Sequence, residues 1–236
     1  MNRPEIWTPV RAETMEEAEA QLKVLAEHPL VDKAEVWMDG IEDLDIPDLF
    51  SKSPIPTIAA NKMPADKGKF RGTYDELARD LVEAAQHGAS MVALPIHTPE
   101  NLFGEVRDSL DRIFTRQERL VPFIGEYHDW EKTPSDMQLR EIAALMEPYV
   151  DVVKMAVTPN SEEDVQRMFE FAAELQRKDI KHILISMKDL GRETRIRTPL
   201  MGGIGMFAPV TLNGATAGGQ LTVQELHEAW SDMEGE

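Results

Sequence analysis

One lysine stands in a run of residues that otherwise reads as a buried strand. Lys154 lies in Asp151-Val-Val-Lys-Met-Ala-Val157, where its immediate neighbours are apolar. Burying an ammonium group is costly unless it is paired or loses its proton. An amine with a lowered pKa is a nucleophile that can form a Schiff base with a ketone or aldehyde. The segment also fits a lysine that ends the strand and reaches water, or one that pairs with Asp151.

His128 is the second residue whose type suits catalysis. It lies in Gly125-Glu-Tyr-His-Asp-Trp130, just after the apolar segment Val121–Ile124. A neutral imidazole is the usual general acid and base near neutral pH, although this one could instead cap a helix that begins near Ser135. The ends of neighbouring parallel strands are about 5 Å apart, so His128 and Lys154 are expected to face one substrate carbon. This pairing favours the catalytic interpretation.

Short apolar segments alternate with amphipathic ones along the chain. Two helices are the clearest: Thr73–His87, with the stripe Leu77, Leu81, Ala84 and Ala85, and Pro99–Gln117, with the stripe Leu102, Val106, Leu110 and Phe114. The expected strands are Glu5–Val10, Ala34–Met38, Ile55–Ala60, Met91–Pro95, Leu120–Tyr127, Val150–Ala156, His182–Ser186 and Gly205–Pro209. No glycine-rich phosphate-binding motif follows the first strand, which argues against a dinucleotide fold. The pattern predicts one (β/α)8 TIM barrel domain over residues 1–236.

In such a barrel, the residues at the carboxyl ends of the strands can meet over one opening. That rule selects polar or aromatic side chains from several expected strands and from the loops after the last two. They are Glu35, Trp37, Asn61, His128, Lys154 and Ser186 at strand ends, and Arg195, Thr216 and Gln220 in loops.

The composition excludes several classes of partner. The formal net charge is −18, which repels nucleic acid and anionic membranes. There is no cysteine, and no histidine and carboxylate spacing suggests a metal centre. No signal peptide or membrane-spanning run is evident, so a cytoplasmic location is expected. An anionic substrate would have to be gathered by specific cations against this acidic background.

Six segments, in order along the chain, resemble motifs of the type I 3-dehydroquinate dehydratase family. Glu-Tyr-His128-Asp-Trp with Thr133-Pro134 resembles the family's Ser-Tyr-His-Asp-Phe and Thr-Pro, and Val-Val-Lys154-Met-Ala resembles its lysine strand. The other four are Ala34-Glu35-Val-Trp-Met-Asp39, Ile185-Ser-Met187, Thr194-Arg195-Ile196 and Ala215-Thr-Ala-Gly-Gly-Gln220-Leu. They resemble the family's Glu-Leu-Arg-Leu-Asp, Met-Gly, Ser-Arg and Ser-Ala-Pro-Gly-Gln. The match covers nearly the whole chain.

The resemblance implies a barrel enzyme, without metal or cofactor, that converts 3-dehydroquinate to 3-dehydroshikimate and water. Lys154 would form the iminium and His128 would move the protons. Arg195 would clamp the substrate carboxylate, with hydrogen bonds from Gln220 and Thr216, and Glu35 would hold substrate hydroxyls. The resemblance also suggests a homodimer.

The chain departs from the family pattern at two arginines and one flap. Trp37 stands where the family has arginine, and Asn61 is matched to the arginine that ends the third strand. The Glu-Gly-Gly flap becomes the basic stretch 65–71. A cation among Lys62, Lys67, Lys69 and Arg71 could compensate for the lost arginines, or the stretch could be a mobile solvated loop. The alternatives are therefore a Schiff-base lyase or dehydratase acting on a different anionic hydroxy-keto acid, and a non-catalytic relative.

Overall fold

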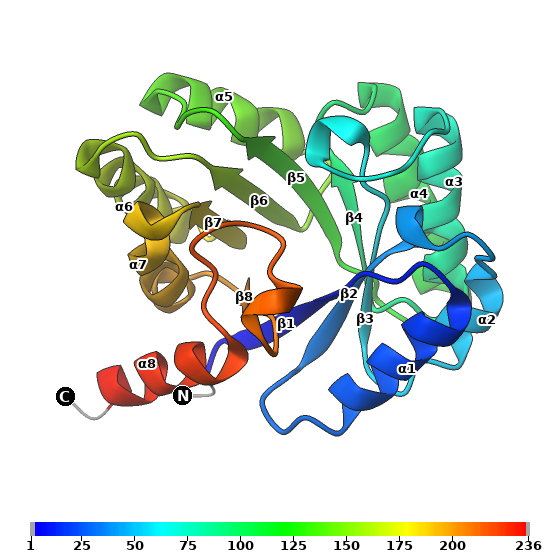
Figure 1. Ribbon diagram of the computed structural model, residues 1–236. Coiled ribbons are helices and arrows are strands. Elements are labelled where there is room, and N and C mark those ends of the chain that lie inside the picture. The colour runs from blue at the N-terminus through cyan, green and yellow to red at the C-terminus, as the bar shows by residue number, and fades with distance from the viewer. Residues whose placement is uncertain (1–2, 235–236) are drawn as a thin grey trace. The chain divides into compact units, whose positions relative to one another are not determined.

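The computed structural model describes residues 3–234, which contain eight strands (Figure 1). The strands form one sheet in the order β7-β6-β5-β4-β3-β2-β1-β8. Their bounds are β1 Glu5–Val10, β2 Lys33–Trp37, β3 Thr57–Ala60, β4 Met91–Pro95, β5 Phe123–Asp129, β6 Val152–Val157, β7 His182–Ser186 and β8 Gly205–Phe207.

An α-helix follows each strand, which confirms the predicted alternation. The helices are α1 Met15–Ala26, α2 Ile46–Ser51, α3 Tyr74–Gln86, α4 Glu100–Gln117, α5 Asp136–Met146, α6 Glu162–Arg177, α7 Arg192–Arg197 and α8 Val223–Glu234. Local sequence explains several starts: Thr73 with Glu76, and Ser135 with Gln138, form reciprocal capping boxes at α3 and α5. None of the helices within residues 3–234 is both long enough and apolar enough to span a bilayer.

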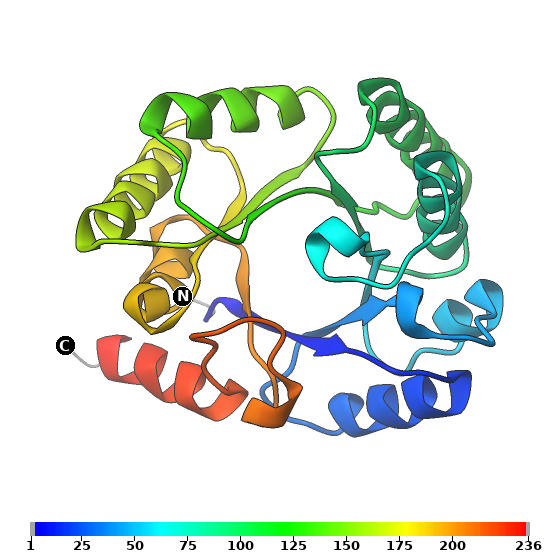
Figure 2. The same cartoon turned by 45° about the horizontal axis from the view of Figure 1, so that its top comes forward.

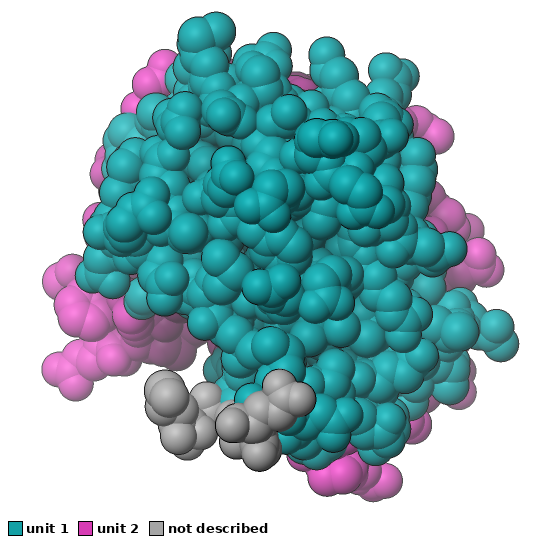
Figure 3. Space-filling model, turned by 90° about the vertical axis from the view of Figure 1, so that its left-hand side faces the viewer, with its two compact units in different colours: residues 1–9, 127–148, 152–236 teal, residues 10–126, 149–151 magenta. Residues whose placement is uncertain are grey.

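The chain divides into two compact units (Figure 3). Unit 2, shown in magenta, comprises residues 10–126 and 149–151. Its strands β2, β3 and β4 pair in parallel, with Trp37 opposite Ala60 and Ala60 opposite Ala93. Helices α3 and α4 lie side by side (Figure 2), and the predicted α3 stripe is buried.

Unit 1 contains residues 3–9, 127–148 and 152–234 of the described chain. Strand β1 pairs with β8, with Trp7 opposite Phe207, and β6 pairs with β7, with Lys154 opposite Ile183. The indole of Trp230, buried in α8, donates to the carbonyl of Ile196 in α7. Whether residues 1–236 behave as one domain stays a prediction.

Several predicted element bounds differ from the structure by one to three residues, and β5 and α4 illustrate the reasons. Strand β5 was expected to end at Tyr127, but it runs to Asp129 and so includes His128. Its backbone pairing with β4 continues through Glu126, whose carbonyl accepts from the N–H of Ile96, and the extended backbone goes on to Asp129 although the apolar run stops at Ile124. In α4 the buried stripe continues to Ile113, whereas Phe114 is 53% exposed. Residues four apart drift around a helix of 3.6 residues per turn, which explains the second error.

The two leucines of α5 provide a direct test of this packing. Leu139 is fully buried, and Leu145 on the same helix is 64% exposed. We expect Leu139→Ala to lower the free energy of unfolding by about 2–5 kcal/mol, because it leaves a cavity in the core. Leu145→Ala removes the same atoms from the surface and should change stability little. Urea unfolding of both variants measures the difference, and equal losses would contradict the assigned packing.

Candidate active site

Lys154 lies third in the six-residue strand β6, and every residue of that strand is buried. Its side chain is 5% exposed, and its Nζ lies 4.1 Å from the centroid of the Phe207 ring in β8. The idea that Lys154 ends the strand and reaches water is therefore wrong. Asp151, considered as its partner, is bonded to the guanidinium of Arg107 and to the backbone N–H of Phe123. The lysine amine is thus held in an apolar strand against an aromatic face.

His128 is the penultimate residue of β5 and is half-buried. Its ring stacks on Trp130, with centroids 5.4 Å apart and an interplanar angle of 7°. The alternative role as a helix cap is wrong, because Ser135 and Gln138 cap α5. The imidazole is therefore held flat against an indole near the end of the strand and is partly exposed.

The chain directly after β5 is hydrogen-bonded to the chain directly after β6. Thr158, the residue following β6, donates from its Oγ1 to the carbonyl of Asp129 at 3.0 Å. Its N–H donates to the carbonyl of Lys132, and its own carbonyl accepts from Thr133 Oγ1 at 3.1 Å. Unit 1 therefore joins the carboxyl ends of the strands that carry His128 and Lys154.

Arg195 in α7 is a buried guanidinium that is 1% exposed. Within residues 3–234 its one hydrogen bond runs from Nη2 to the carbonyl of Gly218 at 3.5 Å, and its Nε has no partner. Burial lowers the pKa of Arg195 to about 10, which still leaves it charged at neutral pH. A desolvated cation with unused donors is suited to binding an anion.

The loop that contacts Arg195 also holds Thr216 and Gln220. The side-chain Oε1 of Gln220 accepts from the N–H of Thr216 at 2.7 Å and from that of Ala217 at 3.3 Å. Gly219 has φ +75°, and a Cβ there would meet the carbonyl oxygen of Lys188 at 2.1 Å. The glycine is required by this close approach, which anchors the loop beside Arg195.

A second charged cluster lies within unit 2. Lys62 is 2% exposed, and its Nζ bonds to Glu126 and lies 3.7 Å from Glu35 Oε1. Burial alone would lower the pKa of Lys62, but the negative charges of Glu126 and Glu35 outweigh it and raise that pKa. Trp37 joins the cluster by donating from Nε1 to Glu35 Oε2 at 2.7 Å. Lys62 is therefore a permanent cation that carboxylates already neutralise.

Asn61 lies apart from this cluster. Its Nδ2 donates to Asp80 Oδ2 on α3 at 2.8 Å. Successive residues at the end of β3 point to opposite faces, so Asn61 faces the helix while Lys62 joins Glu35. The residue beside Glu35 is therefore Lys62 rather than Asn61, and it brings a positive charge there. The basic stretch that follows is tied down, because the N–H groups of Lys62 and Lys69 both donate to the Asp39 carboxylate.

Sequence reasoning missed two residues of these clusters. Phe207 lies in the short strand β8, and Glu126 lies two residues before His128 on β5. Phe207 could have been found from its place in the last expected strand, which would set it among the strand ends. For Glu126 the signal was a carboxylate inside an otherwise apolar strand.

These elements define a (β/α)8 barrel with a buried lysine on its sixth strand and a histidine on its fifth. The type I 3-dehydroquinase family matches residues 6–236, and the chain belongs to that family. A relative from Methanococcoides burtonii is 33% identical over 182 residues, which are 76% of this chain and 72% of the relative. One from Desulfotalea psychrophila is 29% identical over 216 residues, 90% of this chain and 91% of the relative. Both are named 3-dehydroquinate dehydratase.

Solved structures support the same fold. A type I 3-dehydroquinate dehydratase from Clostridium difficile, solved with covalently modified comenic acid, has a TM-score of 0.86 at 20% identity and covers 100% of this chain and 94% of its own. The 3-dehydroquinate dehydratase of Geobacillus kaustophilus has a TM-score of 0.86 at 21% identity, over 99% and 92% of the two chains. The predicted fold class and family are confirmed. The roles of the individual site residues stay predictions.

The buried pair of Lys62 and Glu126 yields a stability test. Glu126→Gln keeps the shape but removes one charge that neutralises Lys62, so we expect a loss of about 3 kcal/mol in the free energy of unfolding. Glu19→Gln changes a carboxylate in an exposed pair with Lys23 and serves as the matched control, with little expected effect. Equal losses in denaturant unfolding would show that the buried pair is not the stabilising contact.

Proposed function

We propose that this protein dehydrates 3-dehydroquinate to 3-dehydroshikimate, with Lys154 as the Schiff-base residue. The observation that carries the proposal is the lysine amine buried in β6 against Phe207. Family membership over residues 6–236 and two relatives named 3-dehydroquinate dehydratase support the choice of substrate. An aromatic face and apolar neighbours shield the amine from water, which favours attack on a carbonyl carbon.

The first half of the reaction activates the substrate. The uncharged amine of Lys154 attacks the C3 ketone, and the resulting carbinolamine takes up a proton from solvent and loses water to form an iminium. The positive nitrogen then serves as an electron sink for the bond between C2 and its hydrogen. That proton becomes acidic enough for an imidazole to remove.

His128 performs the proton transfers in the second half. Its neutral ring accepts the C2 proton, and the resulting enamine expels the C1 hydroxyl, which leaves as water with a proton from the imidazolium. Water then hydrolyses the conjugated iminium, which releases the product, restores the amine of Lys154 and returns the proton taken up when the iminium formed. The net change is the loss of one water molecule. The hydrogen bonds between the chain after β5 and the chain after β6 support this pairing of the two residues.

Arg195 binds the substrate carboxylate in this proposal. Its buried guanidinium has an unpartnered Nε, and a carboxylate would supply both the missing hydrogen bond and a counter-charge. The adjacent loop brings Thr216 and Gln220 to the same region, where a hydroxyl and an amide can bind further oxygens. Substrate contacts by Glu35, Trp37, Asn61 and Lys62, a homodimer and a cytoplasmic location stay predictions.

One observation favours a second candidate substrate. Lys62 is paired with Glu126 and Glu35, and Trp37 carries no charge. These positions would therefore bind an anion less strongly than two unpaired arginines would. A related hydroxy-keto acid with a different pattern of oxygens could therefore be the better substrate for the same Schiff-base chemistry.

The direct experiment follows product formation from 3-dehydroquinate by the ultraviolet absorbance of the conjugated enone. Turnover by the purified protein supports the proposal. No signal across protein and salt concentrations would rule out this substrate, and a screen of other hydroxy-keto acids would then test the second candidate. No reaction with any carbonyl compound would indicate a non-catalytic member of the family.

Replacing the proposed nucleophile gives the sharpest variant. We expect Lys154→Ala to lower kcat by at least about 10³-fold, because the proposed iminium forms on the amine that this change removes. Lys181→Ala is the control. This exposed lysine directly precedes β7 and so lies at the amino end of that strand, whereas the proposed site uses carboxyl ends. Circular dichroism checks that both variants fold. Near-native turnover by folded Lys154→Ala would refute the assigned role.

The carboxylate clamp predicts a different kinetic effect. Arg195→Ala should raise KM by about 10- to 100-fold, the loss expected for a charge-assisted hydrogen bond, with a smaller change in kcat. Arg195→Lys keeps the charge but not the forked geometry, so its KM should lie between those of the wild type and Arg195→Ala. The exposed Arg177→Ala serves as a control for the change in net charge. An unchanged KM in folded Arg195→Ala would show that the clamp is assigned to the wrong residue.

A further inference from the structure

The backbone of Lys188, just beyond the carboxyl end of β7, has a conformation that disfavours any side chain. Its φ is 59° and its ψ is 176°, a combination that only glycine adopts without strain. Lys67 and Glu118 also have positive φ, but their ψ values of 21° and 28° lie in the ordinary left-handed helical region. Strain of this kind persists only where the surrounding structure enforces it, and it is concentrated at functional sites.

Backbone contacts within unit 1 enforce the conformation of Lys188. Its N–H donates to the carbonyl of Gly218 at 2.9 Å, and its own carbonyl accepts from the N–H of Gly191 at 3.2 Å. A Cβ at Gly219 would meet the carbonyl oxygen of Lys188 at 2.1 Å, so the two segments approach each other closely. These contacts use the main chain of Lys188, and a glycine at this position would make them without strain. The loop therefore does not require a lysine.

The same contacts place Lys188 beside the buried guanidinium of Arg195. Nη2 of Arg195 donates to the carbonyl of Gly218 at 3.5 Å, so one oxygen accepts from both the Arg195 side chain and the Lys188 backbone. Arg195 is 1% exposed, and its Nε has no hydrogen-bond partner among residues 3–234. The flexible four-carbon side chain of Lys188 is long enough to bring its ammonium to a ligand bound by Arg195.

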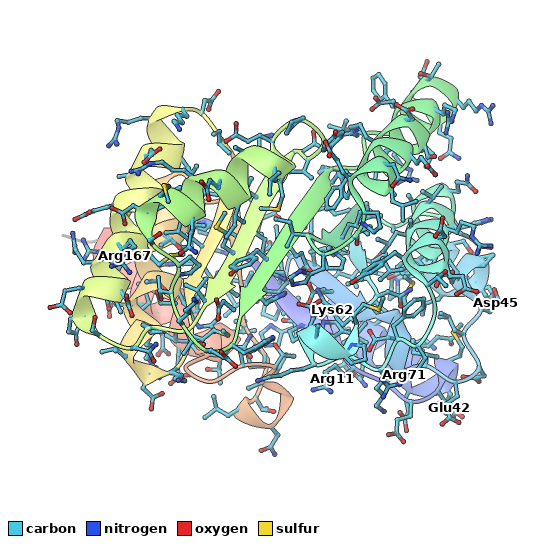
Figure 4. All side chains as sticks on the ribbon, turned by 90° about the horizontal axis from the view of Figure 1, so that it is seen from above. Arg11, Glu42, Asp45, Lys62, Arg71 and Arg167 are labelled. Carbon is cyan, nitrogen blue, oxygen red and sulfur yellow. The ribbon has the colours of Figure 1, made fainter. Side chains whose placement is uncertain are left out.

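The ammonium of Lys188 is not neutralised by the protein. Its side chain is exposed and has no carboxylate partner within the described part of the chain. By contrast, the guanidinium of Arg167 in α6, labelled in Figure 4, is paired with Asp164 at 2.6 Å and with Asp136 at 3.0 Å. In a chain of net charge −18, a cation without such a partner attracts an anion locally.

We propose that Lys188 is a substrate-binding residue that contacts, together with Arg195, the carboxylate of the anionic hydroxy-keto acid substrate. The inference rests on the proposed function and adds a second cation to the carboxylate site. Three observations carry it: the strained backbone, the carbonyl of Gly218 shared with Arg195, and the unpaired ammonium. The strain is retained because glycine, which the backbone favours, has no side chain with which to bind the substrate.

Removing the ammonium should weaken substrate binding more than chemistry. Lys188→Ala should raise KM for 3-dehydroquinate by about five- to tenfold and leave kcat within about twofold. Lys188→Arg retains the positive charge, so its KM should stay close to that of the wild type. Because the ammonium is exposed, raising the salt concentration should narrow the KM difference between the wild type and Lys188→Ala. Lys181→Ala removes an exposed lysine just before the same strand, and this matched control should keep the wild-type KM.

Lys188→Gly tests the strain and the binding role in one variant. It should raise KM as much as Lys188→Ala does, because both variants lose the ammonium. Its Tm should exceed that of Lys188→Ala by about 2–4 °C, because glycine adopts this backbone conformation freely and alanine does not. Thermal unfolding followed by circular dichroism measures the shift. Higher stability combined with weaker binding is the result expected when a strained residue is kept for function and not for folding.

The outcomes separate this inference from the proposed function. If the wild type turns over 3-dehydroquinate and Lys188→Ala has the same KM as Lys181→Ala, the role of Lys188 is overturned and the dehydratase assignment stands. A Tm of Lys188→Gly no higher than that of Lys188→Ala would also overturn it, because the lysine would then be held without strain. Absence of turnover by the wild type would overturn the proposed function and this inference together.

Discussion

A polar amine is kept inside a strand whose six residues are all buried, and the proposed chemistry depends on that constraint. Lys154 is held from one side by in-register pairing of β6 with β7, and its Nζ rests against the ring of Phe207. Burying a charged group costs free energy, and the packing of the rest of the fold must offset that cost. In return, the amine is fixed in direction and shielded from bulk water, which is the arrangement that carbonyl attack requires.

The buried cations Lys62 and Arg195 differ in their partners. Lys62 bonds to Glu126 beside Glu35, so its charge is neutralised within unit 2. Arg195 has unused donors and burial lowers its pKa to about 10, so an incoming anion would relieve its desolvation. The first arrangement stabilises the fold and orients Trp37, whereas the second is suited to binding. A single residue type is therefore a poor guide to role, because the partners of each cation decide it.

Much of the architecture could be predicted because helix and strand periodicity are local properties. The eight-fold alternation, the buried α3 stripe and the buried lysine strand follow from residues near in sequence. The errors arise from contacts that sequence spacing does not carry. Strand β5 continues through polar residues to Asp129, beyond its apolar run, and the choice between Asn61 and Lys62 depends on strand register, where one residue reverses the face. Glu126 reaches Lys62 across 64 residues, a separation that no local pattern encodes.

The central claim is that the amine of Lys154 forms the covalent intermediate, and borohydride trapping tests it most directly. The protein is incubated with 3-dehydroquinate and borohydride, digested, and its peptides are mapped by mass spectrometry. The account predicts one reduced adduct on the peptide containing Lys154, and none in the Lys154→Ala variant. An adduct on another lysine such as Lys62, or no adduct while the protein turns over substrate, would contradict it.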